Sequence, residues 1–107
     1  MINNTTYLQT NALKKLSQEG DIYFNEHNMS QAKICFEQII AMDPLNYEAL
    51  NNLGVIHFTE GRVQQAIEFF HKALEIHEDY AESLENLALC YEKNGDYDEA
   101  AKSFEKV

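Results

Sequence analysis

The feature that most constrains the fold of this chain is a self-similarity with a period of 34 residues. When the sequence is shifted by that period in either direction, side chains of similar size and kind coincide. The matching positions are Leu16, Leu50 and Leu84; Gly20, Gly54 and Ala88; Tyr23, His57 and Tyr91; Ala32, Ala66 and Ala100; and Phe36, Phe70 and Phe104. A unit of this length buries its apolar face against its neighbours, so the pattern predicts a repeat solenoid.

Each unit contains two stretches with helical spacing of apolar residues. In the first unit Ala32, Cys35 and Phe36 begin one such face, and Asn28 with Gln31 has the spacing of a capping box. A similar box is expected at Asp96 and Glu99. The pattern predicts three pairs of helices. The first pair is at about 13–26 and from the cap at Asn28, the second is at about 45–60 and 63–76, and the third is at about 80–93 and from the cap at Asp96 to Val107.

Two connections carry specific turn residues. Gly61 is expected to adopt a left-handed conformation just beyond the end of a helix. Pro44 is excluded from a helix interior, so we expect it in the first turn of the next helix with Asp43 as the cap. Small side chains at Gly54, Ala66 and Ala88 are expected to let paired helices approach closely.

These recurring positions resemble those of the tetratricopeptide repeat family, and the resemblance covers all but the first dozen residues. It implies an all-α solenoid of antiparallel helix pairs in a right-handed superhelix, with three repeats at 13–46, 47–80 and an incomplete 81–107. Residues 1–12 are uncharged and rich in Asn and Thr, which are poor helix formers. We expect them to form a polar, partly disordered segment with a frayed start.

Composition narrows the possible partners. The net charge of −10 opposes binding to nucleic acid, and no basic amphipathic stretch or long apolar run suggests a membrane. Cys35 and Cys90 are expected to be reduced packing residues of a cytoplasmic protein. We expect no enzyme activity, cofactor or metal site, because the four histidines have no helical zinc spacing and His57 fits an interhelical packing position.

The family resemblance also implies a groove for an extended peptide on the first helix of each pair. The residues assigned to that groove are Gln18, Asp21, Phe24, Asn25, Glu48, Asn51, Asn52, Val55, Phe58, Glu82, Glu85, Asn86, Leu89 and Lys93. Asn52 and Asn86, with Gln18, resemble the asparagine ladder of the O-linked N-acetylglucosamine transferase repeats. A side-chain amide both donates and accepts, so it can bracket a peptide unit of any sequence. The alternative is that these asparagines are simply common in the family.

The charge of this groove predicts its ligand. Its carboxylates outnumber its lysines, and the apolar members supply anchors, so we expect a neutral-to-basic peptide. The opposing interpretation is that the carboxylates only keep an exposed face hydrated. Co-chaperone function is disfavoured, because Ser17, Asp21 and Glu82 occupy positions where the chaperone-binding members have a Lys, an Asn and a second Lys.

The last predicted helix leaves an apolar face without a neighbour, formed by Tyr97, Ala101, Phe104 and Val107 together with Ala100. The leading prediction is a protein-interaction scaffold that binds peptide in the groove. Two alternatives stay open. The first alternative is that the chain is a targeting or substrate-recruiting arm of a larger enzyme such as a glycosyltransferase. The second is that it self-associates through this uncapped C-terminal helix.

Overall fold

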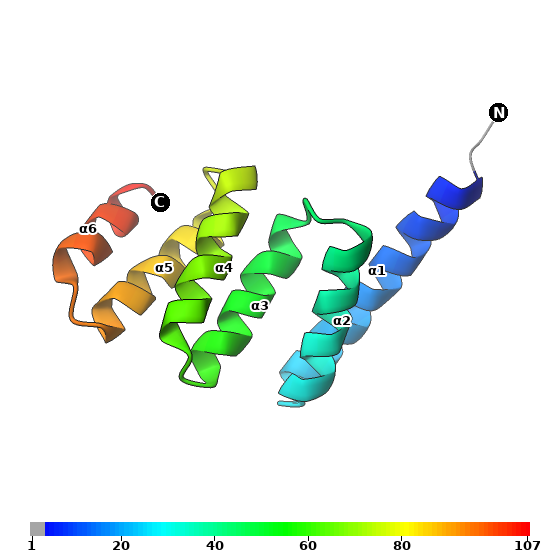
Figure 1. The fold of residues 1–107 in the computed structure, drawn as a ribbon, viewed down its shortest axis with the longest axis horizontal. Helices are drawn as coiled ribbons and strands as arrows, with labels where there is room; N and C mark the ends of the chain where they lie inside the picture. The colour runs from blue at the N-terminus through cyan, green and yellow to red at the C-terminus, as the bar shows by residue number, and fades with distance from the viewer. Residues whose placement is uncertain (1–3) are drawn as a thin grey trace. The chain divides into compact units, whose positions relative to one another are not determined.

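A computed structural model describes residues 4–107, and every regular element in this range is an α-helix (Figure 1). The elements are α1 (Asn4–Asn25), α2 (Met29–Met42), α3 (Tyr47–Thr59), α4 (Val63–Ile76), α5 (Ala81–Lys93) and α6 (Tyr97–Glu105). They form two compact units that divide after Leu45, so that α1 and α2 belong to the first and α3 to α6 to the second. Within the described range, no helix has the length and apolar character that crossing a membrane requires.

The first helix is longer than the sequence predicts. We expected a start near Leu13, but α1 begins at Asn4 and therefore includes most of the segment expected to be partly disordered. Residues 1–3 of that segment lie outside the described residues. Low propensity at Asn4, Thr5 and Thr6 is outweighed because a helix that is already nucleated gains one backbone hydrogen bond for each residue added.

The connection between α2 and α3 also differs from the prediction. Asp43 is the C-cap of α2, with its N–H bonded to the Ile39 carbonyl, and Pro44 lies in a turn rather than in the first turn of α3. Asn46 caps α3 by accepting a hydrogen bond from the Ala49 N–H at 3.0 Å. The residue before a proline avoids the helical region, which explains why α2 ends at Met42.

Capping elsewhere follows the sequence. Asn28 accepts from the Gln31 N–H at 3.4 Å, and Asp96 accepts from the Glu99 N–H at 3.3 Å, as predicted for the starts of α2 and α6. Gly61 has the expected positive φ of 82°. Its counterparts one period away are Gly95 with φ of 79° and His27 with φ of 61°. The three pairs therefore turn with the same backbone geometry, which glycine adopts freely and His27 adopts under strain.

Glycines allow the close approach of paired helices in each unit. A Cβ at Gly20 would lie 2.7 Å from Phe36 Cε1 in the first unit, and a Cβ at Gly54 would lie 2.5 Å from Phe70 Cε1 in the second. Phe36 and Phe70 are almost completely buried. In these two pairs the ring on the second helix thus rests on the bare backbone of the first, as the repeat pattern predicted.

The third helix pair departs from this arrangement. Its glycine is replaced by Ala88, which is fully buried, and the matching ring of Phe104 is 44% exposed. The core of the second unit instead contains Ala66, Ile67, Phe70, Leu87 and Cys90, contributed by α4 and α5. Helix α5 packs mainly against α6 and α4. It also contacts α3 at a few positions.

Candidate functional site

Four of the residues assigned to the groove, two from α3 and two from α5, lie around one hollow. Val55 and Phe58 of α3 meet Asn86 and Leu89 of α5 around a small hollow of about 20 Å³, with Phe70 beneath them. Val55 and Phe58 also pack against the core of the second unit. Leu89 is 45% exposed. The sequence assigned all four lining residues of α3 and α5 to the groove, and the fold brings them to one point.

Asn51, also assigned to the groove, lies in the interior instead. Its side chain is 2% exposed. Its Oδ1 accepts hydrogen bonds from Ser83 Oγ at 2.8 Å and from Asn86 Nδ2 at 3.2 Å. The expectation that Asn51 faces a ligand is therefore wrong. This amide joins α3 to α5 and orients Asn86, which keeps one N–H and its own carbonyl for other partners.

The sequence contained a signal for this internal bond that was not used. Ser83 stands one period after Ala49, so a hydroxyl replaces a methyl group at a position facing a neighbouring helix. A fully buried hydroxyl requires a hydrogen-bond partner. A polar, buried partner for Ser83 on α3 could therefore have been predicted.

Three acidic side chains are exposed on the two helices that form the α3–α5 hollow, but none of them lines it. Glu48 at the start of α3, and Glu82 and Glu85 in α5, are exposed, and Asn52 is half-buried. Tyr80 donates a hydrogen bond to Glu82 Oε2 at 2.8 Å. Burial, this bond and the charges of Glu82 and Glu48 raise the pKa of Tyr80, so it remains a neutral donor.

An aromatic cluster stands at the same end of these helices. Tyr47 lies 4.7 Å from His77 and 4.9 Å from Tyr80, measured between ring centroids. These contacts tie the start of α3 to the turn between α4 and α5 and hold Glu48 and Glu82 at neighbouring helix starts. Tyr80 is the N-cap of α5 but makes no side-chain cap, unlike Asn46 at the matching position of α3.

The groove residues assigned in the first unit lie on α1. Gln18, Asp21 and Asn25 are exposed, and Phe24 is half-buried. Lys93, the last residue assigned in α5, is exposed at the end of that helix. None of these five residues lines the α3–α5 hollow, so the geometry described above concerns the second unit alone.

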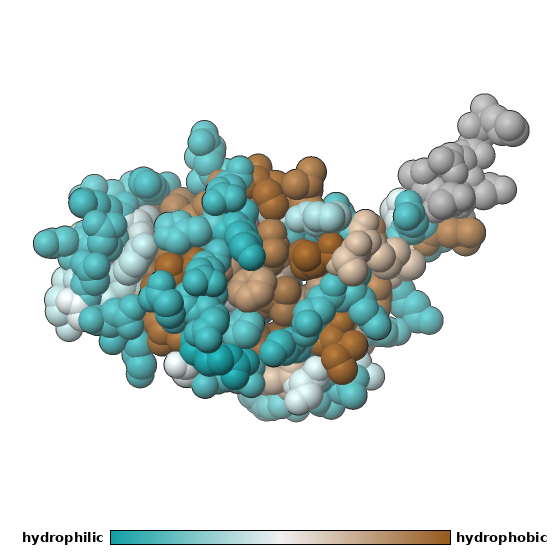
Figure 2. Space-filling view, in the orientation of Figure 1, coloured by the Kyte–Doolittle hydropathy of each residue, from teal (hydrophilic) through white to brown (hydrophobic). Residues whose placement is uncertain are grey.

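The apolar end face has the exposure that the sequence suggested. Tyr97 is 70% exposed and Val107 57% exposed, and Phe104 and Ala101 are also exposed. Ala100 is an exception, because it is buried against the rest of the unit. In the view of Figure 2 the surface of the second unit is mostly hydrophilic, with hydrophobic side chains visible between the polar ones.

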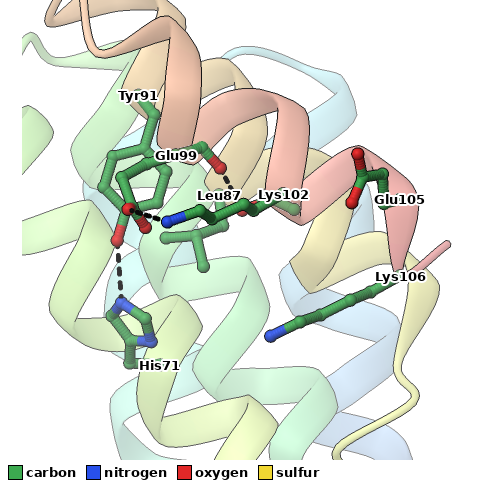
Figure 3. Close-up of a pocket in the computed structure, with 8 residues that line it drawn as sticks. His71, Leu87, Tyr91, Glu99, Lys102, Glu105 and Lys106 are labelled. Carbon is green, nitrogen blue, oxygen red and sulfur yellow. Dashed lines mark hydrogen bonds and ion pairs between the residues drawn. The ribbon is translucent and has the colours of Figure 1, made fainter.

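A larger cavity of about 430 Å³, which we call the α4–α6 cavity, was not found from the sequence. It is lined by His71 of α4, Leu87 and Tyr91 of α5, and Glu99, Lys102, Ser103, Glu105 and Lys106 of α6 and its C-terminus. His71 Nε2 lies 3.1 Å from Tyr91 Oη, and Lys102 Nζ lies 3.1 Å from Glu99 Oε1 (Figure 3). Lys102 lies in α6 and Lys106 is the C-cap of that helix, four residues later. This spacing was the signal for the cavity in the sequence.

His57 has the interhelical position that the repeat predicted. Its ring stacks on Phe69 of α4, with centroids 5.1 Å apart and an interplanar angle of 12°. Arg62 donates from Nε to His57 Nδ1 at 2.9 Å and also pairs with Glu60 at 2.7 Å. The packing role assigned to His57 is confirmed by these contacts.

Both cysteines are buried free thiols, as expected of packing residues. Burial raises the pKa of Cys90 from 9.0 to about 11, and burial together with Glu19 raises the pKa of Cys35. Among the described residues, no group of three or more His, Cys, Asp or Glu side chains is placed to hold a metal ion.

Comparison with protein-family models matches residues 46–107 to one model described as tetratricopeptide repeat and residues 16–44 to a second with the same description. The first match alone spans more than half of the chain. The chain belongs to the tetratricopeptide repeat family. The fold is thus a helical repeat whose established general role is protein–protein interaction.

Solved structures agree with this assignment. The crystal structure of MamA is 28% identical and superposes with a TM-score of 0.76 over 81% of this chain and 51% of that one. The second tetratricopeptide repeat domain of Spaghetti (RPAP3), bound to the HSP90 peptide SRMEEVD, is 20% identical with a TM-score of 0.84 over 94% of both chains. The Sgt2 domain from Aspergillus fumigatus is 24% identical with a TM-score of 0.81, over 88% of this chain and 62% of that one.

This chain therefore spans about half the length of the MamA structures that it matches. A comparison with curated proteins found no match. The Spaghetti and Sgt2 domains share only 20% and 24% identity with this tetratricopeptide protein, so their similarity supports the fold alone.

Proposed function

We propose that this protein is a non-catalytic scaffold that binds an extended, neutral-to-basic peptide on the face formed by α3 and α5. The observation that carries the proposal is the meeting of Val55, Phe58, Asn86 and Leu89 at one hollow. Apolar anchors at the centre of an interface supply most of the binding energy. The hollow is small, so it suits the tip of one aliphatic side chain, with the peptide backbone running beside it.

Asn52 and Asn86 are the residues assigned to that backbone. They are half-buried, one on each helix. The bond from Asn86 Nδ2 to Asn51 reduces the rotamer freedom that a binding amide would otherwise lose. Glu48, Glu82 and Glu85 then favour Lys or Arg in the peptide, and binding through them weakens as salt screens the charges.

The acidic groups also argue against a peptide with a carboxylate-rich end on this face. The Spaghetti domain carries such a peptide, SRMEEVD. In this chain, Glu82 of α5 is an exposed acidic residue at a position where the chaperone-binding members of the family have a Lys. Like charges facing each other disfavour association.

A peptide-array screen tests the proposal, run on the parent chain, on Asn52→Ala/Asn86→Ala and on Gln64→Ala/Gln65→Ala. The control removes two exposed amides from α4. We expect the parent and control to retain the same Lys- or Arg-bearing peptides and the asparagine variant to lose them while keeping its helical circular dichroism. Equal binding by all three, or no binding by the parent, would show that the asparagines serve only the fold.

The wider assignment rests on the same features. We propose that the three helix pairs correspond to three repeats at 13–46, 47–80 and 81–107, and that the protein works in the cytosol, which two buried free thiols favour. Self-association is the second candidate, supported by exposed Tyr97, Phe104 and Val107. Sedimentation across a wide concentration range tests it, since a constant monomer mass would exclude it.

A further inference from the structure

We propose that the α4–α6 cavity is a second binding site, selective for a single carboxylate carried on a short aliphatic chain. The carboxylate comes from an acidic side chain of a partner peptide or from a small free carboxylic acid. At about 430 Å³ the cavity falls within the usual range of ligand pockets. It shares α5 with the α3–α5 face but uses different residues, and its function does not depend on peptide binding there.

The charge of the cavity differs from that of the chain. The sequence has eight Lys and Arg against eighteen Asp and Glu, yet Lys102 and Lys106 both line this one cavity, with His71 on its α4 wall. In Figure 3 the Lys106 side chain extends toward the His71 side of the cavity, whereas the Glu105 carboxylate points in another direction. Two lysines and two glutamates therefore line the cavity, so an anion entering it meets a lining without the net negative charge of the rest of the chain.

The pairing of these groups leaves one cation available. Lys102 Nζ is engaged by Glu99 Oε1 at 3.1 Å. In the part of the chain that the structure describes, Lys106 forms no ion pair within 4.0 Å. One unpaired ammonium group matches one negative charge. The Glu99 carboxylate lining the same cavity opposes a dianion such as phosphate, which sets the preference for a monocarboxylate.

The hydrogen-bonded pair of His71 and Tyr91 keeps one further hydrogen-bond donor, whichever of the two donates in the bond between them. If Tyr91 donates to His71 Nε2, the Nδ1–H of the imidazole remains; if the imidazole donates, the Tyr91 O–H remains. Burial and the nearby charges of Glu99 and Asp96 raise the pKa of Tyr91, so its hydroxyl stays protonated. A carboxylate can therefore accept one hydrogen bond from this pair and one from Lys106.

The apolar residues that line the cavity favour an aliphatic chain attached to the carboxylate. Leu87 and the Tyr91 ring, both from α5, provide apolar surface beneath the polar groups. A carboxylate attached to two or three methylene groups, as in a glutamate side chain or butyrate, places its charge near Lys106 and its chain over this floor. A bare inorganic anion gains nothing from the apolar part.

The test is an NMR titration of the whole chain with sodium butyrate and with acetyl-Ala-Glu-Ala-amide. Acetyl-Ala-Gln-Ala-amide, sodium chloride and sodium phosphate serve as references. We expect amide shifts around Leu87, Tyr91 and Lys106 with both carboxylates. Tighter binding of the peptide would identify a partner protein's side chain as the source, and equal binding would identify the free acid as sufficient; both outcomes support the site.

Two variants with the same change of charge make the titration decisive. Lys106→Gln removes the unpaired cation and is expected to weaken carboxylate binding about fivefold. Lys72→Gln is the control, because Lys72 follows His71 but lies over the Phe69 ring, 5.4 Å from its centroid, and does not line the cavity. The proposal is overturned if both variants bind alike, if the Gln peptide or chloride produces the same shifts, or if phosphate binds more tightly than either carboxylate.

Discussion

Replacing Gly54 by alanine tests whether the helix pairs depend on direct contact between a ring and the backbone. A Cβ at this position would lie 2.5, 2.8 and 2.9 Å from Phe70 Cε1, Cδ1 and Cζ. Phe70 is fully buried, so its ring has no solvent to move into. The helices must separate or the ring must leave its rotamer.

The magnitude follows from two opposing terms. Overpacking a core costs about 1–3 kcal/mol, and three short contacts place this change near 3 kcal/mol. Alanine is the better helix former by about 1 kcal/mol. We therefore expect Gly54→Ala to lower the free energy of unfolding by about 2 kcal/mol and Tm by about 10 °C.

Urea unfolding followed by circular dichroism measures this effect. The companion variant Phe70→Leu removes the ring edge, so the double variant Gly54→Ala/Phe70→Leu is expected to be less destabilised than the sum of the single changes by about 1 kcal/mol or more. If Gly54→Ala instead stabilised the protein by about 1 kcal/mol, helix propensity alone would govern the site and the packing argument would be refuted. In the third pair, where Ala88 carries a methyl group at the position of Gly54, the matching Phe104 is partly exposed, as this packing argument expects.

Three further predictions concern single positions. Asn51→Ala leaves the buried Ser83 hydroxyl without its acceptor and should lower the free energy of unfolding, measured in urea, by about 2–3 kcal/mol. Ser83→Ala removes the donor itself and should lower it by about 1 kcal/mol or less. Equal costs of the two variants would contradict the bond at 2.8 Å. His27→Gly should raise Tm, because it relieves a positive φ that costs a net of about 0.5–1 kcal/mol. Gly61→Ala should lower Tm through the same backbone strain, since no atom lies within 4 Å of the added Cβ. If the two variants had the same Tm, backbone strain would not be the cause. Burial raises the pKa of Cys90 from 9.0 to about 11, so its protonated thiol contributes stability that is complete below pH 9 and is lost as pH rises toward 11. The cause is that the unfolded chain releases this proton at lower pH than the folded chain. Over that window the free energy of unfolding of Cys90→Ala should therefore fall less steeply than that of the parent.

The repeat period predicted most of the fold because it reports packing directly. A residue that fills the same space in each pair, such as Phe36 or Phe70, must recur at the same interval, and the helices follow from it. The ends of helices were less predictable. Asn4 starts α1 despite poor propensity, and Asn46 rather than Asp43 caps α3, since boundaries depend on local competition among weak terms.

The candidate site was predictable only where it follows the repeat. Val55 and Leu89 occupy equivalent positions of two repeats, Phe58 and Asn86 lie three residues from them on the same helices, and the structure brings all four together. The burial of Asn51 depends on Ser83, a substitution specific to one repeat, and so it breaks the periodic reasoning. The α4–α6 cavity was missed for the same reason, because His71, Tyr91 and Lys106 converge from three helices without sharing a repeat position.

The central claim, that the exposed acidic residues of α3 and α5 select a basic peptide, is tested most directly by reversing their charge. Fluorescence anisotropy would compare a Lys-bearing peptide from the array with its Glu-bearing counterpart, on the parent and on Glu82→Lys/Glu85→Lys. Both positions are exposed, so the fold should tolerate the change. The account predicts that the parent prefers the Lys peptide, more weakly at high salt, and that the variant prefers the Glu peptide. An unchanged preference in the variant would contradict it.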